Sequence, residues 1–380
     1  MKILLSGVET NNKGAELMFY AILQEIERKA PNAEVYISRN RIKQGLNYVK
    51  TGVNLKLIPC EDLEDKLHLT SLFARLKLPF KLLPHFLTMG EIDYYIDSSG
   101  FRYSDQFNFT HSMVNVFRNQ LITYKKQGAK IIFLPQAFGP FKKKVTKDVL
   151  SILMQYATIV MPREEVSKKY VEELGYDKSE KLKIFPDFTS LVEGIFPERY
   201  EKLRNGICVI PNKQMINKGA ISLEKYLELL ENIITISKQS GRIVYLLNHE
   251  GRKDEQLCQD LQKALPEKVE YVSGINALEV KGLISSAYLV ISSRFHGVAS
   301  ALNTRVPCLA TSWSHKYKEL FNDYKMNDCI LPLDNTTKAT SMITEYLNEV
   351  KNQNIRSVLS HQTSVLQKEA REMWNTIWGL

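Results

Sequence analysis

The chain alternates short apolar runs with longer segments whose apolar residues recur every three or four positions. Short runs of this kind are typical of buried strands, and the longer periodic segments are typical of helices. In the segment GAELMFYAILQEIERKA, Met18, Ile22 and Ile26 share one helical face and Pro31 limits the helix. The runs with strand character cover residues 2–6, 34–38, 54–59, 92–97, 130–135, 158–162, 182–186, 207–211, 242–247, 269–273, 288–292, 307–311 and 329–333.

Strands and helices in alternation predict an α/β fold whose parallel sheets are covered by helices on both faces. The series restarts after the charged stretch at 198–206, so we expect two Rossmann-like domains, one over 1–200 and the other over 206–350. A helical segment at 360–378 is expected to pack back on the first domain. Because ligands of such folds bind beyond the carboxyl ends of strands, candidate functional residues are sought just after the apolar runs.

The composition suits a globular protein that handles anions. Of the 380 residues, 44% are hydrophobic and 24% are charged, and 51 basic against 42 acidic residues leave a net charge of +9. This excess favours an anionic small molecule, a phospholipid surface or nucleic acid as partner. No dense block of Lys and Arg with interleaved aromatics occurs, so we expect no nucleic-acid partner.

Cysteine usage and hydropathy predict a cytoplasmic protein. The five cysteines are widely spaced and form no CxxC pair, which is typical of reduced packing residues. The segment MKILLSGVET turns polar too soon for a signal peptide, and no apolar run reaches the length of a membrane span. Residues 66–90 are rich in Leu, Phe and basic residues. They form either a core-facing helical pair or a basic amphipathic surface that docks on anionic lipid at the inner face of the cell membrane.

The first candidate site follows the first apolar run. Asn12, Lys13 and Gly14 stand in a turn before a helix, where backbone N–H groups and the positive helix end favour an anionic or polar ligand. The turn is neither a GxGxxG fingerprint nor a P-loop. The structural alternative is that Asn12 caps the helix and that Gly14 only permits the turn.

Two further candidates follow later strands of the first domain. Arg163 comes just after an apolar run, and its guanidinium suits bidentate binding of a carboxylate or phosphate. The alternative is a surface arginine that pairs with Glu164 or Glu165. Asp187 also follows an apolar run, where it either orients a hydroxyl, acts as a base, or caps a helix.

The densest group of candidates belongs to the second domain. Arg294 and His296, in SSRFHG, follow a strand candidate, and burying cations there is costly unless an anion meets them. His315 and Lys316 follow the next strand candidate, so they share a pocket with that pair if the two strands are neighbours. Such a group suits a multiply charged anion and contains a histidine that titrates near neutral pH. His249 also follows a strand, where a lone histidine is more often structural than ligand-binding.

Missing motifs narrow the chemistry. No HExxH, CxxC pair, EF-hand loop or GxSxG occurs, so common zinc, calcium and serine-hydrolase sites have no support. The lack of a D-x-D motif weakens metal-assisted nucleotide-sugar chemistry. We therefore expect no metal and no cofactor.

Five stretches, taken in order, resemble the polysaccharide pyruvyl transferase family. They are GVETNNKGAELM, LPQAFGPF, MPREEVSKKYVEELGY with the later FPDFTSL, LLNHEGRKDEQ, and SSRFHGVASALNTRVPCLATSWSHKYKEL. Each stretch alone is weak, but the ordered series spans most of the chain. The series is much more specific for the family than for a substrate.

The resemblance implies two Rossmann-like domains in a GT-B-like arrangement with the active cleft between them. It implies phosphoenolpyruvate as the donor and a pair of sugar hydroxyls as the acceptor. The acceptor glycan would belong to a cell-surface polysaccharide, such as a capsule or exopolysaccharide, or to its lipid-linked precursor. The product would be a pyruvate ketal, with phosphate released.

The resemblance also assigns residues. The family's R-x-H element falls on Arg294 and His296, and its arginine in the R-E turn falls on Arg163. The remaining matches are an H-K element and an Asn-Gly-Ala-Glu loop, which fall on His315 and Lys316 and on Asn12, Gly14, Ala15 and Glu16. In this interpretation the two arginines clamp the donor, with Lys316 as a further positive charge. His296 is the general acid–base, and either Glu16 or Asp187 activates the acceptor hydroxyl.

One stretch departs from the family. Where relatives tend to carry a Gly-rich turn, this chain has IDSSGFRYSD, with Ser98 and Ser99 before Gly100. Serine tolerates positive φ poorly, so we expect a different loop shape on the acceptor side.

Two other functions stay open on the sequence. A GT-B glycosyltransferase would use the same cationic group to hold the diphosphate of a nucleotide sugar. A non-catalytic subunit of an export complex would bind glycan or phospholipid, in part through residues 66–90, and would release no phosphate.

Overall fold

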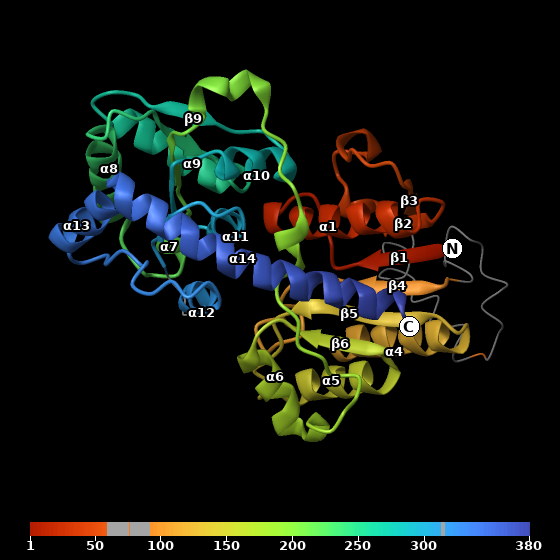
Figure 1. The fold of residues 1–380 in the computed structure, drawn as a ribbon. Coiled ribbons are helices and arrows are strands. Elements are labelled where there is room, and N and C mark those ends of the chain that lie inside the picture. The colour runs from red at the N-terminus through yellow and green to blue at the C-terminus, as the bar shows by residue number, and fades with distance from the viewer. Residues whose placement is uncertain (59–75, 77–91, 313–315) are drawn as a thin grey trace. The chain divides into compact units, whose positions relative to one another are not determined.

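The computed structural model describes residues 1–58, 76, 92–312 and 316–380, with only the backbone described at Lys316. The chain divides into two compact units (Figure 1). Unit 1 comprises residues 1–11, 15–189 and 369–380, and unit 2 comprises residues 12–14 and 190–368. Each unit is built on its own parallel sheet, which confirms the α/β class that the alternating pattern predicts.

Unit 1 holds a six-stranded parallel sheet of order β3-β2-β1-β4-β5-β6. The strands are β1 (Lys2–Ser6), β2 (Glu34–Ser38), β3 (Asn54–Ile58), β4 (Tyr94–Asp97), β5 (Lys130–Gln136) and β6 (Ile159–Pro162). The strand order reverses between β1 and β4, where Ser6 lies beside Asp97 at the carboxyl ends. Open α/β sheets bind ligands at such a reversal, so polar residues there are candidates for the site.

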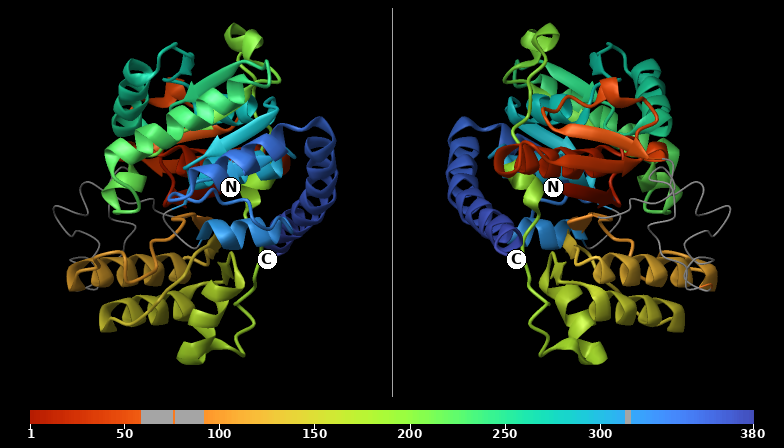
Figure 2. Two further views of the ribbon diagram at one scale, coloured as in Figure 1. Left: turned by 90° about the vertical axis from the view of Figure 1, so that its left-hand side faces the viewer. Right: turned by 90° about the vertical axis from the view of Figure 1, so that its right-hand side faces the viewer.

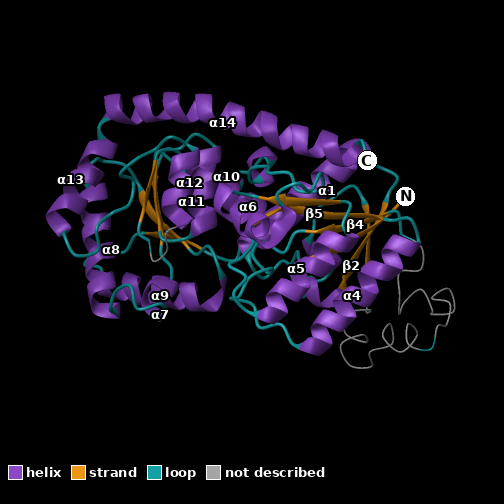
Figure 3. Ribbon diagram, turned by 90° about the horizontal axis from the view of Figure 1, so that it is seen from below, coloured by secondary structure: helices purple, strands orange, loops and turns teal. Residues whose placement is uncertain are grey.

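Helices cover both faces of this sheet (Figure 3). They are α1 (Lys13–Lys29), α4 (His111–Lys126), α5 (Lys144–Tyr156) and α6 (Glu165–Val171), the last continued by a π-helical turn over Glu172–Tyr176. Short 3₁₀ turns occupy Arg39–Arg41, Leu46–Tyr48 and Phe188–Leu191. Met18, Ile22 and Ile26 of α1 are all buried, as their shared face predicts.

Unit 2 holds a five-stranded parallel sheet of order β11-β10-β7-β8-β9. The strands are β7 (Ile207–Ile210), β8 (Val244–Leu247), β9 (Glu270–Val272), β10 (Leu289–Ser292) and β11 (Cys308–Ala310). Almost every residue of β7, β8, β10 and β11 is buried, because helices lie on both faces (Figure 3). The charged stretch at 198–206, where the sequence predicts a domain boundary, lies inside unit 2 and forms a 3₁₀ helix over Glu198–Leu203.

Polar side chains cap three of the helices that the structure describes in unit 2. Ser222, Asn276 and Asn335 each accept a hydrogen bond from a backbone N–H in the first turn, and Asn276 forms a full capping box with Glu279. The helices are α7 (Gln214–Asn217), α8 (Leu223–Lys238), α9 (Gly251–Ala264), α10 (Ala277–Ser285), α11 (Phe295–Asn303), α12 (Lys316–Asp323) and α13 (Thr336–Leu347).

Two predicted strands, at 182–186 and 329–333, are wrong. Each segment makes only one isolated bridge, Leu182 to Val160 in the first and Ile330 to Ala310 in the second. Proline explains the first failure, because Pro162 at the end of β6 has no N–H to donate to the segment beside it. In the second segment Leu331 donates to the carbonyl of Ala310, and β11 ends at that residue, so the ladder has no further partner.

The long helix α14 (Glu349–Trp378) passes from unit 2 into unit 1 (Figure 2). In unit 2, Arg356 donates to the carbonyls of Ala287 and Tyr288 at 3.0 Å. In unit 1, Trp378 donates from its indole nitrogen to the Oε1 of Glu25 at 2.8 Å. One continuous helix therefore contributes to the packing of both units.

Two features concern association with a membrane, namely a spanning helix and the predicted lipid-docking segment. In the part that the structure describes, no helix has both the length and the apolar character needed to cross a bilayer. Residues 66–90, the predicted lipid-docking surface, lie outside the described residues except for Leu76.

Candidate functional site

The carboxyl ends of three neighbouring strands of unit 2 are joined by a buried polar network around Ser293. The Oγ of Ser293 lies 2.5 Å from the hydroxyl oxygens of both Tyr226 and Thr311. Its carbonyl accepts hydrogen bonds of 2.8 Å from the Nδ2 of Asn212 and the hydroxyl of Tyr317. Because every member is satisfied, this network fixes the loops that leave β7, β10 and β11.

Strands β10 and β11 are parallel neighbours, with Ser292 beside Ala310, as the shared-pocket hypothesis requires. At the exit of β10, the ring of Phe295 lies edge-on to His296 and to Tyr317, with centroids 5.4 Å and 5.7 Å away. Lys316 begins α12, and only its backbone is described. His315 lies outside the described residues, so its place in this group stays a prediction.

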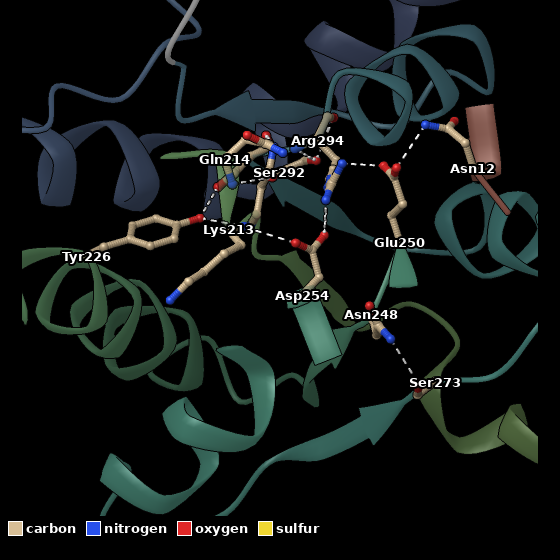
Figure 4. Close-up of polar contacts among 12 residues, drawn as sticks. Asn12, Lys213, Gln214, Tyr226, Asn248, Glu250, Asp254, Ser273, Ser292 and Arg294 are labelled. Atoms are coloured by element: carbon tan, nitrogen blue, oxygen red, sulfur yellow. Dashed lines mark hydrogen bonds and ion pairs between the residues drawn. The ribbon is translucent and has the colours of Figure 1, made fainter. Parts of the chain in front are cut away.

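Arg294 lies against two carboxylates of the chain itself (Figure 4). Its Nε and Nη2 each lie 2.6 Å from the Oδ2 of Asp254. Its Nη1 donates to the Oε2 of Glu250. The negative charge expected beside this partly buried arginine is thus supplied by two carboxylates, one in the first turn of α9 and one on the residue before that helix.

The two carboxylates differ in their surroundings. Asp254 is fully buried, and its Oδ1 accepts a 2.9 Å hydrogen bond from the backbone N–H of Lys213. Burial raises the pKa of Asp254 to about 6, although Arg294 pulls that pKa down. Glu250 keeps 26% of its side chain exposed, and its Oε1 accepts a 2.8 Å hydrogen bond from the Nδ2 of Asn12.

The turn that contains Asn12 meets His296. The Oδ1 of Asn12 accepts from the backbone N–H of Gly14 at 2.9 Å, so this side chain both supports the start of α1 and reaches Glu250. A Cβ added to Gly14 would lie only 2.0 Å from the Cδ2 of His296. Gly14 therefore does more than permit the turn, because its bare backbone makes room for the imidazole. The structure thus brings Asn12, Gly14, Arg294 and His296 together.

His249 lies near Arg294 and His296 but is uncharged near neutral pH. Burial, with added repulsion from Arg294, His296 and Lys13, lowers the pKa of His249 well below its usual range. Only 3% of His249 is exposed, and its Nδ1 has no hydrogen-bond partner among the residues that the structure describes. His249 is therefore a neutral neighbour of the cationic group rather than a member of it.

The other predicted arginine belongs to unit 1. At the exit of β6, the Nε of Arg163 lies 3.3 Å from the Oε2 of Glu164, and its Nη1 lies 3.8 Å from the Oδ2 of Asp187. Asp187 also accepts from the N–H and the hydroxyl of Thr189, at 2.8 Å and 2.7 Å. Both structural alternatives, pairing with Glu164 and helix capping by Asp187, are thus present. Glu16, on α1 in the same unit, is fully buried.

A second polar group lies along the carboxyl edge of the unit 1 sheet. The buried carboxylate of Asp97, at the end of β4, accepts from the hydroxyl of Ser99 at 2.9 Å and from the Nε2 of Gln136 at 3.3 Å. A carboxylate only accepts here, so the amide of Gln136 must turn its nitrogen toward Asp97. The Oε1 of Gln136 has no hydrogen-bond partner within the described part of the chain.

The serine-containing turn after β4 needs no strained serine. Gly100 has a φ of 73°, and neither Ser98 nor Ser99 has a positive φ. The space for Ser99 comes instead from Gly7 after β1, where an added Cβ would lie 2.5 Å from the backbone nitrogen of Ser99. The glycine that lets the two loops pass so close together is therefore Gly7, on the loop after β1.

Glu250 and Asp254 were absent from the predicted site. The signal in the sequence is two acidic residues four positions apart directly after a strand, in NHEGRKDE. Residues at this spacing face the same side of a helix, so a carboxylate pair at a strand exit could have been expected to meet a buried arginine. Within the described residues, no group of three or more His, Cys, Asp or Glu side chains is arranged to hold a metal ion.

Solved structures of low sequence identity share the fold. UDP-GlcNAc 2-epimerase from Neisseria meningitidis, solved with UDP-GlcNAc, has a TM-score of 0.62 at 11% identity, with 100% of both chains covered. HepE from Anabaena, solved with UDP-glucose, has a TM-score of 0.55 at 11% identity, covering 99% of this chain and 100% of that one. WaaG, a glycosyltransferase of lipopolysaccharide biosynthesis, has a TM-score of 0.53 at 11% identity and 100% coverage of both. The likeness shows the two Rossmann-like units of GT-B enzymes.

Sequence comparison identifies a family. No curated protein matches the chain. The family model described as polysaccharide pyruvyl transferase matches residues 12–315, from the turn before α1 to the loop after β11. The matched range includes every residue that the resemblance singled out except Lys316.

Proposed function

Because the chain belongs to the polysaccharide pyruvyl transferase family, we propose that it moves the pyruvyl group of phosphoenolpyruvate onto two hydroxyls of a sugar. The acceptor is part of a cell-surface polysaccharide or its lipid-linked precursor. One observation carries the proposal, namely that the turn at Asn12–Gly14 meets Arg294 and His296 at one sheet edge of unit 2.

The donor carries a phosphate and a carboxylate on a compact frame, so it requires fixed positive groups. Arg294 and Arg163 are the residues that we assign to these two anionic groups, with Lys316 as a further cation. Guanidinium groups suit this task because their planar donors match both anions. Each guanidinium already contacts carboxylates of the chain, so donor binding must share or displace those contacts.

The chemistry needs one acid and two hydroxyl additions. His296 gives a proton to the methylene carbon of the donor, and the neighbouring carbon gains oxocarbenium character. One sugar hydroxyl adds to that carbon and returns its proton to His296. The C–O bond to phosphate then breaks, and the second hydroxyl closes the ketal while its proton leaves with the phosphate. A positioned acid of this kind contributes about 10²–10⁴-fold to the rate, and no step requires a cofactor.

The acceptor hydroxyls need a base and hydrogen-bond partners. Asp187 and Glu16 both stay candidates for the base. Asp187 is partly exposed beside Arg163, whereas Glu16 is fully buried, so Asp187 is the more accessible of the two. The amide oxygen of Gln136 has no partner among the described residues, so it suits a donated hydroxyl hydrogen. This supports the carboxyl edge of the unit 1 sheet as an acceptor surface.

The test is release of inorganic phosphate from phosphoenolpyruvate, with and without a panel of free and lipid-linked oligosaccharides. The wild-type protein should release phosphate only with a suitable acceptor. His296→Asn should lose at least about 10²-fold of this rate and still bind the donor, because the anion contacts survive. His361→Asn, an exposed histidine of α14, is the matched control. An active His296→Asn enzyme would exclude histidine from the chemistry.

The fold supports one alternative. Several proteins of similar structure were solved with UDP or UDP sugars, so a nucleotide-sugar-dependent glycosyltransferase is the second candidate. The two functions are separated by thermal melting with each donor. Phosphoenolpyruvate should raise the melting temperature of a pyruvyl transferase, and a nucleotide sugar should raise that of the alternative.

A further inference from the structure

The two carboxylates that contact Arg294 are held in different ways, and we propose that they have opposite effects on anion binding. Asp254 positions the guanidinium and is needed for binding. Glu250 occupies the place of a ligand anion on Arg294 and so makes the site selective for multiply charged ligands. The inference rests on the proposed function in one respect, which is that the natural ligand is phosphoenolpyruvate.

Asp254 has the features of a permanent support. Its carboxylate is fully buried, contacts both Nε and Nη2 of Arg294 at 2.6 Å, and accepts from the backbone N–H of Lys213. Contacts to Nε and Nη2 fix the plane of a guanidinium group. A ligand that displaced Asp254 from Arg294 would leave a buried carboxylate without its cation. Because this is energetically costly, the contact must persist when an anion binds.

Glu250 has the features of a replaceable partner. It contacts only Nη1 of Arg294 and is 26% exposed, in contrast to the 0% of Asp254. Its other oxygen accepts from the Nδ2 of Asn12, a neutral donor that can donate equally well to the oxygen of a ligand (Figure 4). When Glu250 turns toward solvent, Arg294 and Asn12 both present donors to an incoming anion.

The charges explain the selectivity. One guanidinium against two carboxylates gives the occupied group a formal charge of −1 when both are ionised. A monovalent anion gains little by exchanging with Glu250, because it replaces one charge by an equal one and is not tethered to the site. A ligand with a dianionic phosphate and a carboxylate makes more charge-assisted hydrogen bonds, and so it displaces Glu250.

The test compares two isosteric variants for binding of phosphoenolpyruvate, pyruvate and inorganic phosphate by titration calorimetry at constant ionic strength. Glu250→Gln removes the competing charge, so it should tighten phosphoenolpyruvate and phosphate by about tenfold and make pyruvate binding measurable. Asp254→Asn should weaken both phosphoenolpyruvate and phosphate by about tenfold or more. Asp260→Asn is the control, because it removes the same charge from α9 at a residue that contacts only Gln256 and Lys263 in the described structure.

Each outcome decides the inference. Equal or weaker anion binding by Glu250→Gln, with the melting temperature preserved, would overturn the role of Glu250. Unchanged binding by Asp254→Asn would overturn the support role, and a shift in Asp260→Asn as large as in Glu250→Gln would reduce the effect to net charge. Absence of anion binding by Glu250→Gln would also contradict the inference, because in that variant no carboxylate competes at Nη1 of Arg294.

The inference and the proposed function fail in different ways. Tighter phosphate binding by Glu250→Gln, with no binding or turnover of phosphoenolpyruvate by any form, would keep the role of Glu250 and reject the donor. Turnover of phosphoenolpyruvate by the wild-type protein, with no gain in affinity in Glu250→Gln, would keep the function and reject the inference.

Discussion

At the scale of single residues, His296 occupies the space that a side chain at Gly14 would need. An added Cβ at Gly14 would lie 2.0 Å from Cδ2 and 2.3 Å from Nε2 of the imidazole. Those distances are far below any normal carbon contact, so a side chain at position 14 must push the ring aside. The imidazole is the end of a side chain, and it can move at smaller cost than backbone.

We therefore predict that Gly14→Ala lowers turnover far more than stability. Misplacement of a catalytic group by about 1 Å can cost about 10²-fold in rate. The rate should be measured as phosphate release, beside the melting temperature. In a His296→Asn background the same substitution should have little further effect on the rate, because the displaced ring is already gone. A full second loss in the double variant would mean that Gly14 acts by another route.

Sequence reasoning found most of these residues but missed their relation to one another. Arg294 and His296 follow a buried strand, which marks them, and Asn12 and Gly14 follow another. The pairing of Arg163 with Glu164 was one of the predicted alternatives, but the pairing of Arg294 depends on side-chain positions that the sequence analysis did not consider. Asp187 was considered, but its contact with Arg163 became visible only once β6 and the segment after it were placed.

At the scale of elements, α9 introduces an acidic residue into the interior. Asp254 lies in the first turn of this helix, faces Arg294 and Glu250, and has its pKa raised to about 6 by burial. An aspartate in an unfolded chain has a pKa near 3.9. The folded protein thus binds a proton more tightly than the unfolded chain does, and raising the pH through about 6 lowers its stability.

This linkage predicts a pH-dependent difference between the wild-type protein and Asp254→Asn. From about pH 5 to about pH 7.5 the wild-type protein should lose about 1–2 kcal/mol of unfolding free energy relative to the variant, which cannot titrate at this position. Melting temperatures of both proteins across that range measure the effect. A constant difference across the range would show that Asp254 titrates normally.

Hydrophobic patterning located the strands well and failed at two edges. All the central strands of both sheets lie within a residue or two of the predicted runs. The failures at 182–186 and 329–333 have a physical cause, since an apolar run reports burial and not the donors that a ladder needs. Pro162 lacks the donor that would face the first segment, and β11 ends at Ala310 beside the second.

At the scale of the whole molecule, α14 links the stability of unit 1 to the C-terminal end of the chain. Trp374 is 1% exposed and packs edge-on against Phe188, with centroids 5.9 Å apart, and stacks on Trp378 at 6.4 Å. Both contacts lie within unit 1. The first part of the same helix packs instead on unit 2, through Arg356 and Thr363.

We predict that Trp374→Ala destabilises unit 1 selectively, by about 3–5 kcal/mol, because it removes a large buried ring. Hydrogen exchange followed by mass spectrometry should show lost protection in β1, β4 and β5 and little change in β7, β8 and β10. Val365→Ala, at a more exposed position of α14, should change neither. Equal loss of protection in both units would contradict the selective role.

The two-unit α/β fold was predictable because strand–helix alternation is a pattern of the whole chain and tolerates local error. The acceptor was not, because recognition of a sugar depends on the arrangement of individual polar side chains, which no periodicity encodes. The family assignment narrows the reaction class, and the sugar must be found by experiment.

The most direct test of the central claim is mass spectrometry of the acceptor glycan after incubation with the protein and phosphoenolpyruvate, beside measurement of inorganic phosphate. The account predicts one pyruvate ketal on the glycan for each phosphate released, and neither product with His296→Asn. Release of phosphate from phosphoenolpyruvate while the glycan stays unmodified would contradict it. Transfer of a sugar from a nucleotide donor under the same conditions would also contradict it.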